Sequence, residues 1–289
     1  MNITRHAPAA RRTRLVTLSL LLVLTLLAST LPRPGLMPTA SAFDGVIVPG
    51  FTQLSIGPGD DHSSEEIHLP FAISFFGTTY RSLYVNNNGN VTFDAPLSAY
   101  TPFSLLSTSH PMIAPFFGDV DTRGIEAERA INSDFARYGV STFEGHRAFG
   151  VTWGGVGVGY YDSRVDKLNK FQMLIVERPD EGPGDFDIVF NYDQIQWETG
   201  EASGGLDGLG GDSARAGFTN GSDASFEMPG SAINGAFLDG APTGLRHNSN
   251  VNVAGRYVFP VRNGLSAVYT STGFLVNGLP LPLCPRDDA

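Results

Sequence analysis

Cysteine is almost absent from this chain of 289 residues, which contains a single one, Cys284. No disulfide can form within the chain, so a folded domain has to be held together by its core. That composition is typical of exported bacterial proteins and less so of animal matrix proteins. We expect the lone thiol to be inert, and pairing between two chains is the alternative.

Apolar residues at helical spacing are also scarce, and 125–138 is the best helix candidate. Its apolar side chains form no clean stripe, so a short helix and a variable loop both stay open there. Glycine (34 residues) and proline (19 residues) are frequent and separate short runs of alternating apolar and polar residues. Such runs between turn residues predict a mainly β protein.

Basic residues are few once the first 42 residues are set aside. Five of the 19 lysines and arginines, and none of the 29 acidic residues, precede residue 43, which leaves a net charge of −15. Such a surface repels phosphate backbones and anionic lipids, so we expect no binding to nucleic acid. It suits a soluble exported protein or one that collects cations.

The first 42 residues have the organisation of a secretory signal peptide. Arginines precede an uncharged stretch, Leu15 to Leu31, and Ala40-Ser41-Ala42 forms a small-x-small cleavage site. The alternative is an uncleaved transmembrane anchor, because the stretch is near the lower length limit for crossing a bilayer. We expect cleavage after about Ala42, secretion, and no membrane insertion afterwards. Arg11-Arg12 leaves a twin-arginine route open beside the general one.

The rest of the chain divides into an entry segment (43–70), a β-rich domain (71–262) and a C-terminal strand and tail (263–289). Ten runs in the domain predict an antiparallel β-sandwich or a strongly curved sheet with long glycine-rich loops and little helix. The runs are 71–75, 82–86, 90–93, 112–114, 148–153, 170–177, 186–192, 195–198, 214–219 and 256–261. A further strand is predicted at 265–269.

Three local patterns add detail to this outline. Asn88-Gly89 predicts a two-residue type I′ hairpin, because Asn tolerates positive φ and Gly adopts it freely. Strict alternation over 186–192 predicts a strand with one buried face and one face in water. The glycine-rich stretch 201–212 is predicted to be a loop without regular structure.

The two tryptophans are predicted to be core residues. Trp153 and Trp197 each end a β-rich run, where filling the core is commoner than stacking on a sugar. Ile195 shares a face with Trp197, so we expect the two to be buried together.

Short motifs recur along the domain in an order that resembles the nidogen-like extracellular domain, often called NIDO, over roughly residues 71 to 262. The motifs are FFG (75–77), YVNNNG (84–89), IAPFFGDVD (113–121), VTW (151–153), KFQ (170–172), FNY (190–192), IQW (195–197), AGF (216–218), NSNV (248–251) and GRYVF (255–259). The string 190–217 resembles the bacterial secreted branch of that family.

The resemblance implies an extracellular location and a role in cell–matrix adhesion, as in basement-membrane nidogen, tectorins and membrane mucins. It implies no defined ligand and no chemistry. The chain departs from the animal proteins because it lacks their cysteine-rich modules and carries an acidic insert at 125–137.

The stretch Asp119 to Gly124 begins like a calcium loop, with carboxylates at positions 1 and 3 and glycine at position 6. It then departs, because Arg123 stands at position 5 and Ala130 stands where an EF-hand has its bidentate Glu. Asp119 and Asp121 remain candidate Ca²⁺ ligands in a looser site. The alternative is that Asp119 accepts backbone N–H bonds in a turn and Asp121 pairs with Arg123 or another base. No other cofactor is expected.

The sequence contains neither a G-x-S-x-G nucleophile motif nor an H-E-x-x-H zinc motif. A glycosidase needs two carboxylates roughly 5 to 10 Å apart. Such a pair stays open among four acidic residues, Glu144, Glu177, Asp193 and Glu198.

Together these observations predict a secreted, non-enzymatic adhesion or matrix-type protein that binds an unidentified extracellular protein or glycan. Its binding surface is expected on loops 98–110, 122–137 and 201–212, because loops need not bury their backbone. An envelope carbohydrate-binding or carbohydrate-active protein is one alternative. A structural component of an extracellular polymer is another.

Overall fold

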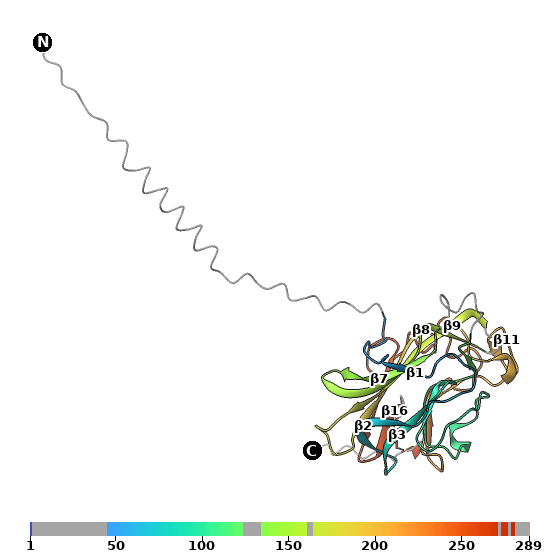
Figure 1. Ribbon diagram of the computed structural model, residues 1–289, viewed down its shortest axis with the longest axis horizontal. Coiled ribbons are helices and arrows are strands. Elements are labelled where there is room, and N and C mark those ends of the chain that lie inside the picture. The colour runs from blue at the N-terminus through green and yellow to red at the C-terminus, as the bar shows by residue number, and fades with distance from the viewer. Residues whose placement is uncertain (2–44, 124–133, 161–163, 271–272, 277–278, 281–289) are drawn as a thin grey trace. The chain divides into compact units, whose positions relative to one another are not determined.

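The structure is a computed structural model that describes Met1 and residues 45–123, 134–160, 164–270, 273–276 and 279–280 (Figure 1). Side chains are described there except at 155–165 and beyond 264. The predicted signal peptide and Cys284 lie outside the described residues. Within these ranges, no helix has the length and hydropathy that a membrane crossing requires.

Ten strands form one antiparallel sheet, with its longest strands in the middle. β8 (His146–Tyr160) pairs with β9 (Arg164–Glu177), which pairs in turn with β10 (Phe186–Gln194). The strands outside them are β1 (Leu54–Ser55), β7 (Ala136–Phe143), β15 (Arg256–Arg262), β16 (Leu265–Thr270), β17 (Gly273–Val276) and β18 (Leu279–Pro280). The order is β1-β7-β8-β9-β10-β15-β16-β17-β18, and β6 (Val120–Asp121) pairs separately with β8.

A second antiparallel sheet has six strands in the order β14-β13-β5-β4-β3-β2. Their bounds are β2 (Ile67–Phe75), β3 (Thr78–Asn86), β4 (Asn90–Thr92), β5 (Met112–Phe117), β13 (Arg215–Thr219) and β14 (Ser225–Glu227). A separate small hairpin joins β11 (Gly205–Leu206) and β12 (Leu209–Gly210). The helices in the described part are two 3-10 turns, η1 (Leu105–Ser107) and η2 (Glu201–Ser203). The prediction of a mainly β, antiparallel fold is confirmed.

One apolar cluster joins the two sheets. It contains Val85 and Ile113 from the six-stranded sheet together with Phe149 and Phe190 from the ten-stranded one, as expected for a sandwich. Buried aromatic side chains dominate it, and they supply most of the apolar area that such a core removes from water. The largest of its fully buried side chains are Trp153, Trp197, Tyr192, Phe75, Phe116, Phe149, Phe171, Phe186 and Phe190.

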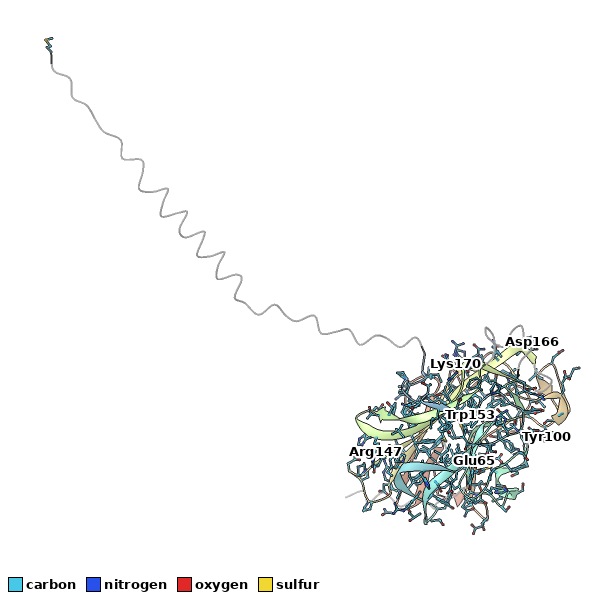
Figure 2. The ribbon with its side chains drawn as sticks, in the orientation of Figure 1. Glu65, Tyr100, Arg147, Trp153, Asp166 and Lys170 are labelled. Carbon is cyan, nitrogen blue, oxygen red and sulfur yellow. The ribbon has the colours of Figure 1, made fainter. Side chains whose placement is uncertain are left out.

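Both tryptophans lie inside this core, which confirms the prediction. Figure 2 labels Trp153 within the folded part of the chain. Trp153 stacks on Phe171 with ring centroids 5.1 Å apart. Trp197 and Phe116 form a T-shaped pair with ring centroids 5.4 Å apart. Ile195 is fully buried with Trp197, although 195–198 is not a strand as predicted. The backbone N–H groups of Gln196 and Trp197 both donate to the side-chain oxygen Oδ1 of Asn169 and not to a neighbouring strand.

The entry segment covers part of the outer face of the ten-stranded sheet. Phe51 packs into a second apolar cluster with Phe143, Ala148, Leu174, Val176 and Val189. Gly150 makes room for its ring, since a Cβ at Gly150 would lie 2.6 Å from the ring of Phe51. The backbone of Val48 is held by Gln172, whose Oε1 accepts from its N–H (3.0 Å) and whose Nε2 donates to its carbonyl (2.8 Å).

This cover overturns the prediction that β10 has one face in water. Val189 and Asn191, on the face expected to be wet, are both fully buried. Asn191 Nδ2 donates to Gln172 Oε1 (2.9 Å), and its Oδ1 accepts from Arg256 Nε (2.8 Å). Alternate side chains of β10 therefore face two different cores. One set packs into the core between the sheets, and the other packs into a smaller outer core that also contains hydrogen-bonded polar groups.

Three other local predictions need correction. Asn86 pairs with Asn90, so the β3–β4 loop has three residues, and of these only Gly89 has positive φ (76°), unlike a type I′ turn. Residues 136–138, placed in a helix or loop, begin strand β7, whereas 124–133 lie outside the described residues. The stretch 201–212 contains η2 and the β11–β12 hairpin, because its glycines adopt the left-handed conformations that such tight turns need.

Candidate functional site

The two predicted calcium ligands, Asp119 and Asp121, have different surroundings. Asp121 is fully buried and bonds the Arg123 guanidinium, with Nε 2.9 Å from Oδ1 and Nη2 2.7 Å from Oδ2. Asp119 is 1% exposed, and its Oδ2 has no hydrogen-bond partner in the described part of the chain. Asp121 thus pairs with Arg123, as the alternative to calcium binding predicted. The same alternative predicted that Asp119 accepts backbone N–H bonds, but its Oδ2 accepts none among the described residues.

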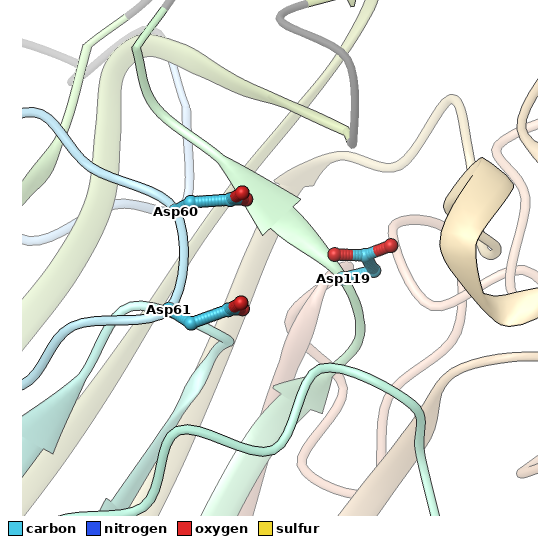
Figure 3. Close-up of side chains that lie close together, drawn as sticks. All are labelled: Asp60, Asp61 and Asp119. Carbon is cyan, nitrogen blue, oxygen red and sulfur yellow. The ribbon is translucent and has the colours of Figure 1, made fainter.

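Asp119 instead faces two acidic residues of the entry segment, Asp60 and Asp61 (Figure 3). One carboxylate oxygen from each of the three residues lies within 4.8 Å of the other two. Asp60 and Asp61 are partly buried. Asp60 Oδ2 bonds Arg123 Nη2 at 2.7 Å, while its buried Oδ1 has no hydrogen-bond partner among the described residues. We call Asp60, Asp61 and Asp119 the acidic cluster.

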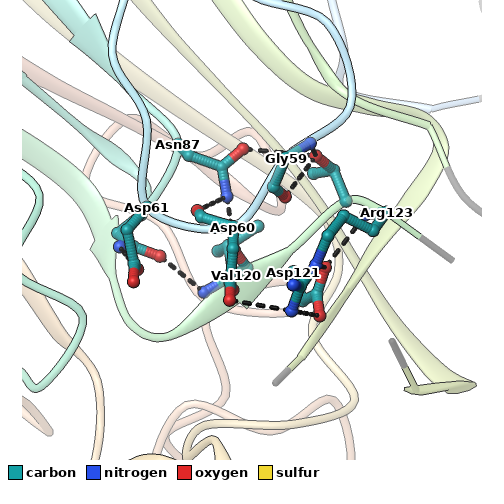
Figure 4. A network of polar contacts seen from close by, with 9 residues as sticks. Gly59, Asp60, Asp61, Asn87, Val120, Asp121 and Arg123 are labelled. Carbon is teal, nitrogen blue, oxygen red and sulfur yellow. Dashed lines mark hydrogen bonds and ion pairs between the residues drawn. The ribbon is translucent and has the colours of Figure 1, made fainter. Parts of the chain in front are cut away.

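Two asparagines of the β3–β4 loop hold the acidic cluster in place, and Figure 4 labels the first of them, Asn87, beside Asp60 and Val120. The side-chain amide of Asn87 donates to the backbone carbonyls of both Asp60 and Val120. Asn88 Nδ2 donates to Asp61 Oδ1, and Asn88 Oδ1 accepts from the Val120 N–H, each at 2.8 Å. Hydrogen bonds from two asparagine side chains therefore hold together residues from three distant parts of the sequence.

Burial and mutual repulsion shift the acidity of the cluster. Burial, with the neighbouring charges of Asp60, Asp61 and Asp121, raises the pKa of Asp119 to about 7. Burial, with the charges of Asp121 and Asp61, raises the pKa of Asp60 to about 6. Three ionised carboxylates at this spacing repel one another, so the cluster favours either a bound proton or a bound cation.

The three predicted binding loops reach this cluster. In loop 98–110, the carbonyl of Ala99 accepts from Asn88 Nδ2 (3.3 Å). Loop 201–212 begins after Gly200, where an added Cβ would lie 2.2 Å from Asp119 Oδ2. Loop 122–137 begins at Thr122 and Arg123, which pair with Gly59 and Asp60. Ser203 Oγ also donates to Thr101 Oγ1 at 3.1 Å and so joins two of the loops.

The four carboxylates considered for glycosidase chemistry have separate environments. Glu177 pairs with Arg147 at 2.9 Å, and Asp193 pairs with Lys170 at 3.0 Å. Glu198 is fully buried and accepts the backbone N–H groups of Gly235 and Phe237. Glu144 lines a surface hollow with Asp187, but Asp187 forms ion pairs with Arg178 and Arg262. A glycosidase needs a carboxylic acid that faces a free carboxylate across a cleft. Glu177, Asp193 and Glu198 are instead bound by other groups, and the acidic neighbour of Glu144 in the hollow is bound by two arginines.

Replacing Glu198 with glutamine should lower the free energy of unfolding by about 1 to 3 kcal/mol, because one backbone N–H would then face an NH₂ donor. The structural reason is that the two Glu198 oxygens anchor the segment that contains Gly235 and Phe237. Urea unfolding of both proteins measures the difference. Glu177→Gln is the control, because its arginine-paired carboxylate is partly exposed and should contribute less than about 1 kcal/mol. Equal losses in the two variants would contradict the anchoring role.

Sequence reasoning found Asp119 but missed Asp60 and Asp61. The only local signal was a pair of aspartates directly after the Gly57-Pro58-Gly59 turn. Their meeting with Asp119 depends on contacts between residues about sixty positions apart, such as the bond between Gly59 N and Thr122 Oγ1 (2.8 Å). A pattern confined to neighbouring residues does not contain that information.

Comparison with known proteins gives a consistent set of relatives. A family model described as nidogen-like domain matches residues 81–263. Alpha-tectorin of Mus musculus is 39% identical over 220 residues, which cover 70% of this chain and 10% of alpha-tectorin. Nidogen of Drosophila melanogaster is 28% identical over 223 residues, which cover 71% of this chain and 15% of that protein. The chain thus spans between about a tenth and a seventh of these relatives' length. No solved structure matches it.

Proposed function

This chain belongs to the nidogen-like domain family, and on that premise we propose that it is a secreted, non-enzymatic binding protein of the matrix or adhesion type. The same domain occurs in the extracellular matrix proteins tectorin and nidogen. Export by a signal peptide cleaved after about Ala42, and membership of the bacterial secreted branch, form part of the proposal. Both rest on the sequence patterns at 1–42 and 190–217.

The observation that carries this proposal is a set of exposed apolar side chains on loops that hydrogen bonds join together. Leu206, at the tip of the β11–β12 hairpin, is 76% exposed, and Ile233 is 62% exposed. The Gly210 N–H donates to Asn234 Oδ1 at 2.7 Å, so the segment with Ile233 lies against this hairpin. Tyr100 is also exposed, next to the Thr101 that bonds Ser203 (Figure 2). We call Tyr100, Leu206 and Ile233 the apolar loop surface.

An extracellular protein is the partner that suits this surface. Exposed large apolar side chains on loops that bond to one another suit a protein interaction site, where aromatic residues often serve as anchors. A glycan fits less well, because Trp153 and Trp197, the residues best suited to stack on sugar rings, are both fully buried. Loops held by a rigid sandwich also position such anchors at small entropic cost.

The test is solid-phase binding of the full chain to a basement-membrane extract, beside a glycan array and an oligosaccharide hydrolysis assay. Leu206→Ser and Tyr100→Ser should each weaken binding to the extract by about tenfold or more, because anchors of this kind carry a large share of binding energy. Val140→Ser removes a similarly exposed apolar side chain from β7 and should leave binding unchanged.

Three results would contradict the proposal. Binding that survives both loop substitutions would place the contact elsewhere on the molecule. Binding to glycans alone would favour a carbohydrate-binding protein. Turnover of an oligosaccharide would make the protein an enzyme.

A further inference from the structure

The geometry points to a calcium site formed by Asp60, Asp61 and Asp119. The three carboxylate oxygens lie within 4.8 Å of one another. Calcium holds its oxygen ligands at about 2.3 to 2.6 Å, so two ligands of one ion are at most about 5 Å apart. The spacing of the acidic cluster therefore matches three ligands of one ion. The inference rests on this geometry and is independent of the binding role proposed above.

Unsatisfied buried oxygens are the second observation in favour of a ligand. Asp119 is 1% exposed and points toward Asp60 and Asp61, yet its Oδ2 has no hydrogen-bond partner in the described part of the chain (Figure 3). The buried Oδ1 of Asp60 is in the same condition. Buried carboxylate oxygens are costly unless a donor or a cation satisfies them, and nearly all buried polar groups in proteins have such a partner.

The local charge also favours a divalent cation. Four carboxylates, those of the cluster and Asp121, surround one guanidinium, that of Arg123. Arg123 is bound to Asp121 and to Asp60 Oδ2, so it approaches the cluster from one side. His62 is the other basic group near Asp60, and its Nε2 lies 2.8 Å from the carbonyl of Ile56. The pKa values of Asp119 and Asp60 are raised by burial and by repulsion between the carboxylates, which the charge of Arg123 only partly offsets.

Calcium is the divalent cation that this donor set suits best. The cluster offers carboxylate oxygens and neither thiolate nor imidazole, which zinc and copper prefer. Magnesium requires a near-ideal octahedron at about 2.0 to 2.1 Å and gives up its water reluctantly, whereas calcium accepts irregular sites. Water can complete the shell of 6 to 8 ligands that calcium takes on average.

A calcium ion here would connect two parts of the fold. Asp60 and Asp61 belong to the entry segment, and Asp119 directly precedes β6. Gly200 forms one wall, because an added Cβ would lie 2.2 Å from Asp119 Oδ2. Its φ of −74° and ψ of 160° are open to alanine, so Gly200→Ala adds bulk at the cluster without backbone strain. That substitution leaves all three carboxylates in the chain.

The test is calorimetric titration of chelator-treated full chain with CaCl₂ at pH 7.5, with MgCl₂ titrated in parallel. We expect a single site with Kd in the range of about 10⁻⁴ to 10⁻³ M, as in other extracellular calcium modules. Ten millimolar CaCl₂ should also raise the thermal unfolding midpoint by a few degrees, because calcium binds only the folded state. Magnesium should bind at least tenfold more weakly.

Two variants test the ligands. Asp119→Asn and Gly200→Ala should each weaken calcium binding by at least tenfold and remove the rise in midpoint. Asp119→Asn should still fold, because it replaces a carboxylate that burial already disfavours in its charged form. Asp94→Asn is the matched control, since it removes one charge from an exposed pair with His110 and should bind calcium as the parent does.

The inference is overturned if the folded parent protein shows neither heat nor a shift in midpoint at 10 mM CaCl₂. It is equally overturned if Asp119→Asn and Gly200→Ala both bind calcium like the parent. Neither readout requires the protein partner, so failure of the calcium site and failure of the proposed binding role are separate results.

Discussion

Gly89→Ala is expected to prevent stable folding, with a loss in free energy of unfolding above about 4 kcal/mol. A Cβ at Gly89 would lie 1.7 Å from the backbone oxygen of Phe116 in β5. That backbone cannot retreat easily, because the Phe116 N–H donates to the Gly89 carbonyl (3.2 Å) and the Gly118 N–H donates to Asn88 O (3.3 Å). Positive φ (76°) adds a second penalty for alanine.

Gly77→Ala separates these two penalties. Gly77 has almost the same φ (80°), but an added Cβ there would meet nothing within 4 Å. Gly77→Ala should therefore lower the free energy of unfolding by only about 1 kcal/mol, which is the cost of placing alanine at positive φ. Secreted yield and urea unfolding of the two variants give the comparison. Similar losses in both would mean that strain in the turn, and not the contact with β5, makes Gly89 necessary.

Trp153→Ala should reduce the free energy of unfolding by about 3 to 5 kcal/mol, the usual loss when a large aromatic residue is removed from a core. Trp153 is fully buried between the sheets and stacks on Phe171 at an interplanar angle of 15°. Its Nε1 donates to the carbonyl of Asn87 at 3.1 Å. The side chain thus connects the core to the loop that holds the acidic cluster.

Trp153→Phe retains most of the buried ring and loses the bond to Asn87, so it should cost about 1 to 3 kcal/mol. Trp197 is then the only tryptophan in the chain, and its buried position makes fluorescence a direct probe of unfolding. Urea titrations of both variants against the parent measure the two losses. If the phenylalanine variant is as unstable as the alanine variant, the hydrogen bond, and not ring packing, accounts for the contribution of Trp153 to stability.

The sequence was sufficient for the main strands and for the core. Runs such as 170–177 and 186–192 combine β-branched and aromatic residues with bounding turn residues, and both correspond to strands, β9 and β10. Burial of Trp153 and Trp197 followed from the same alternation. These features depend on residues that are neighbours in the sequence, where periodicity is informative.

Long-range contacts account for most of what sequence reasoning missed. The wet face expected for β10 is covered by Phe51, which comes from a segment far earlier in the chain. Asp60 and Asp61 meet Asp119 through long-range bonds, because Asn87 and Asn88 hold both segments and Thr122 bonds Gly59. The three-residue β3–β4 loop was missed because its length depends on the pairing of Asn86 with Asn90, which the Asn-Gly pair alone does not specify.

The entry segment on the outer face imposes an order on folding. Arg256 Nη2 donates to the carbonyl of Val46 at 3.0 Å, across a sequence separation of 210 residues. Val46 therefore gains this native contact only after almost the whole domain has been synthesised. Until then Phe143, Val176 and Val189 lack their cover. Topologies with such distant contacts fold slowly and expose apolar strands on the way, so protection from aggregation before folding is a requirement of this architecture.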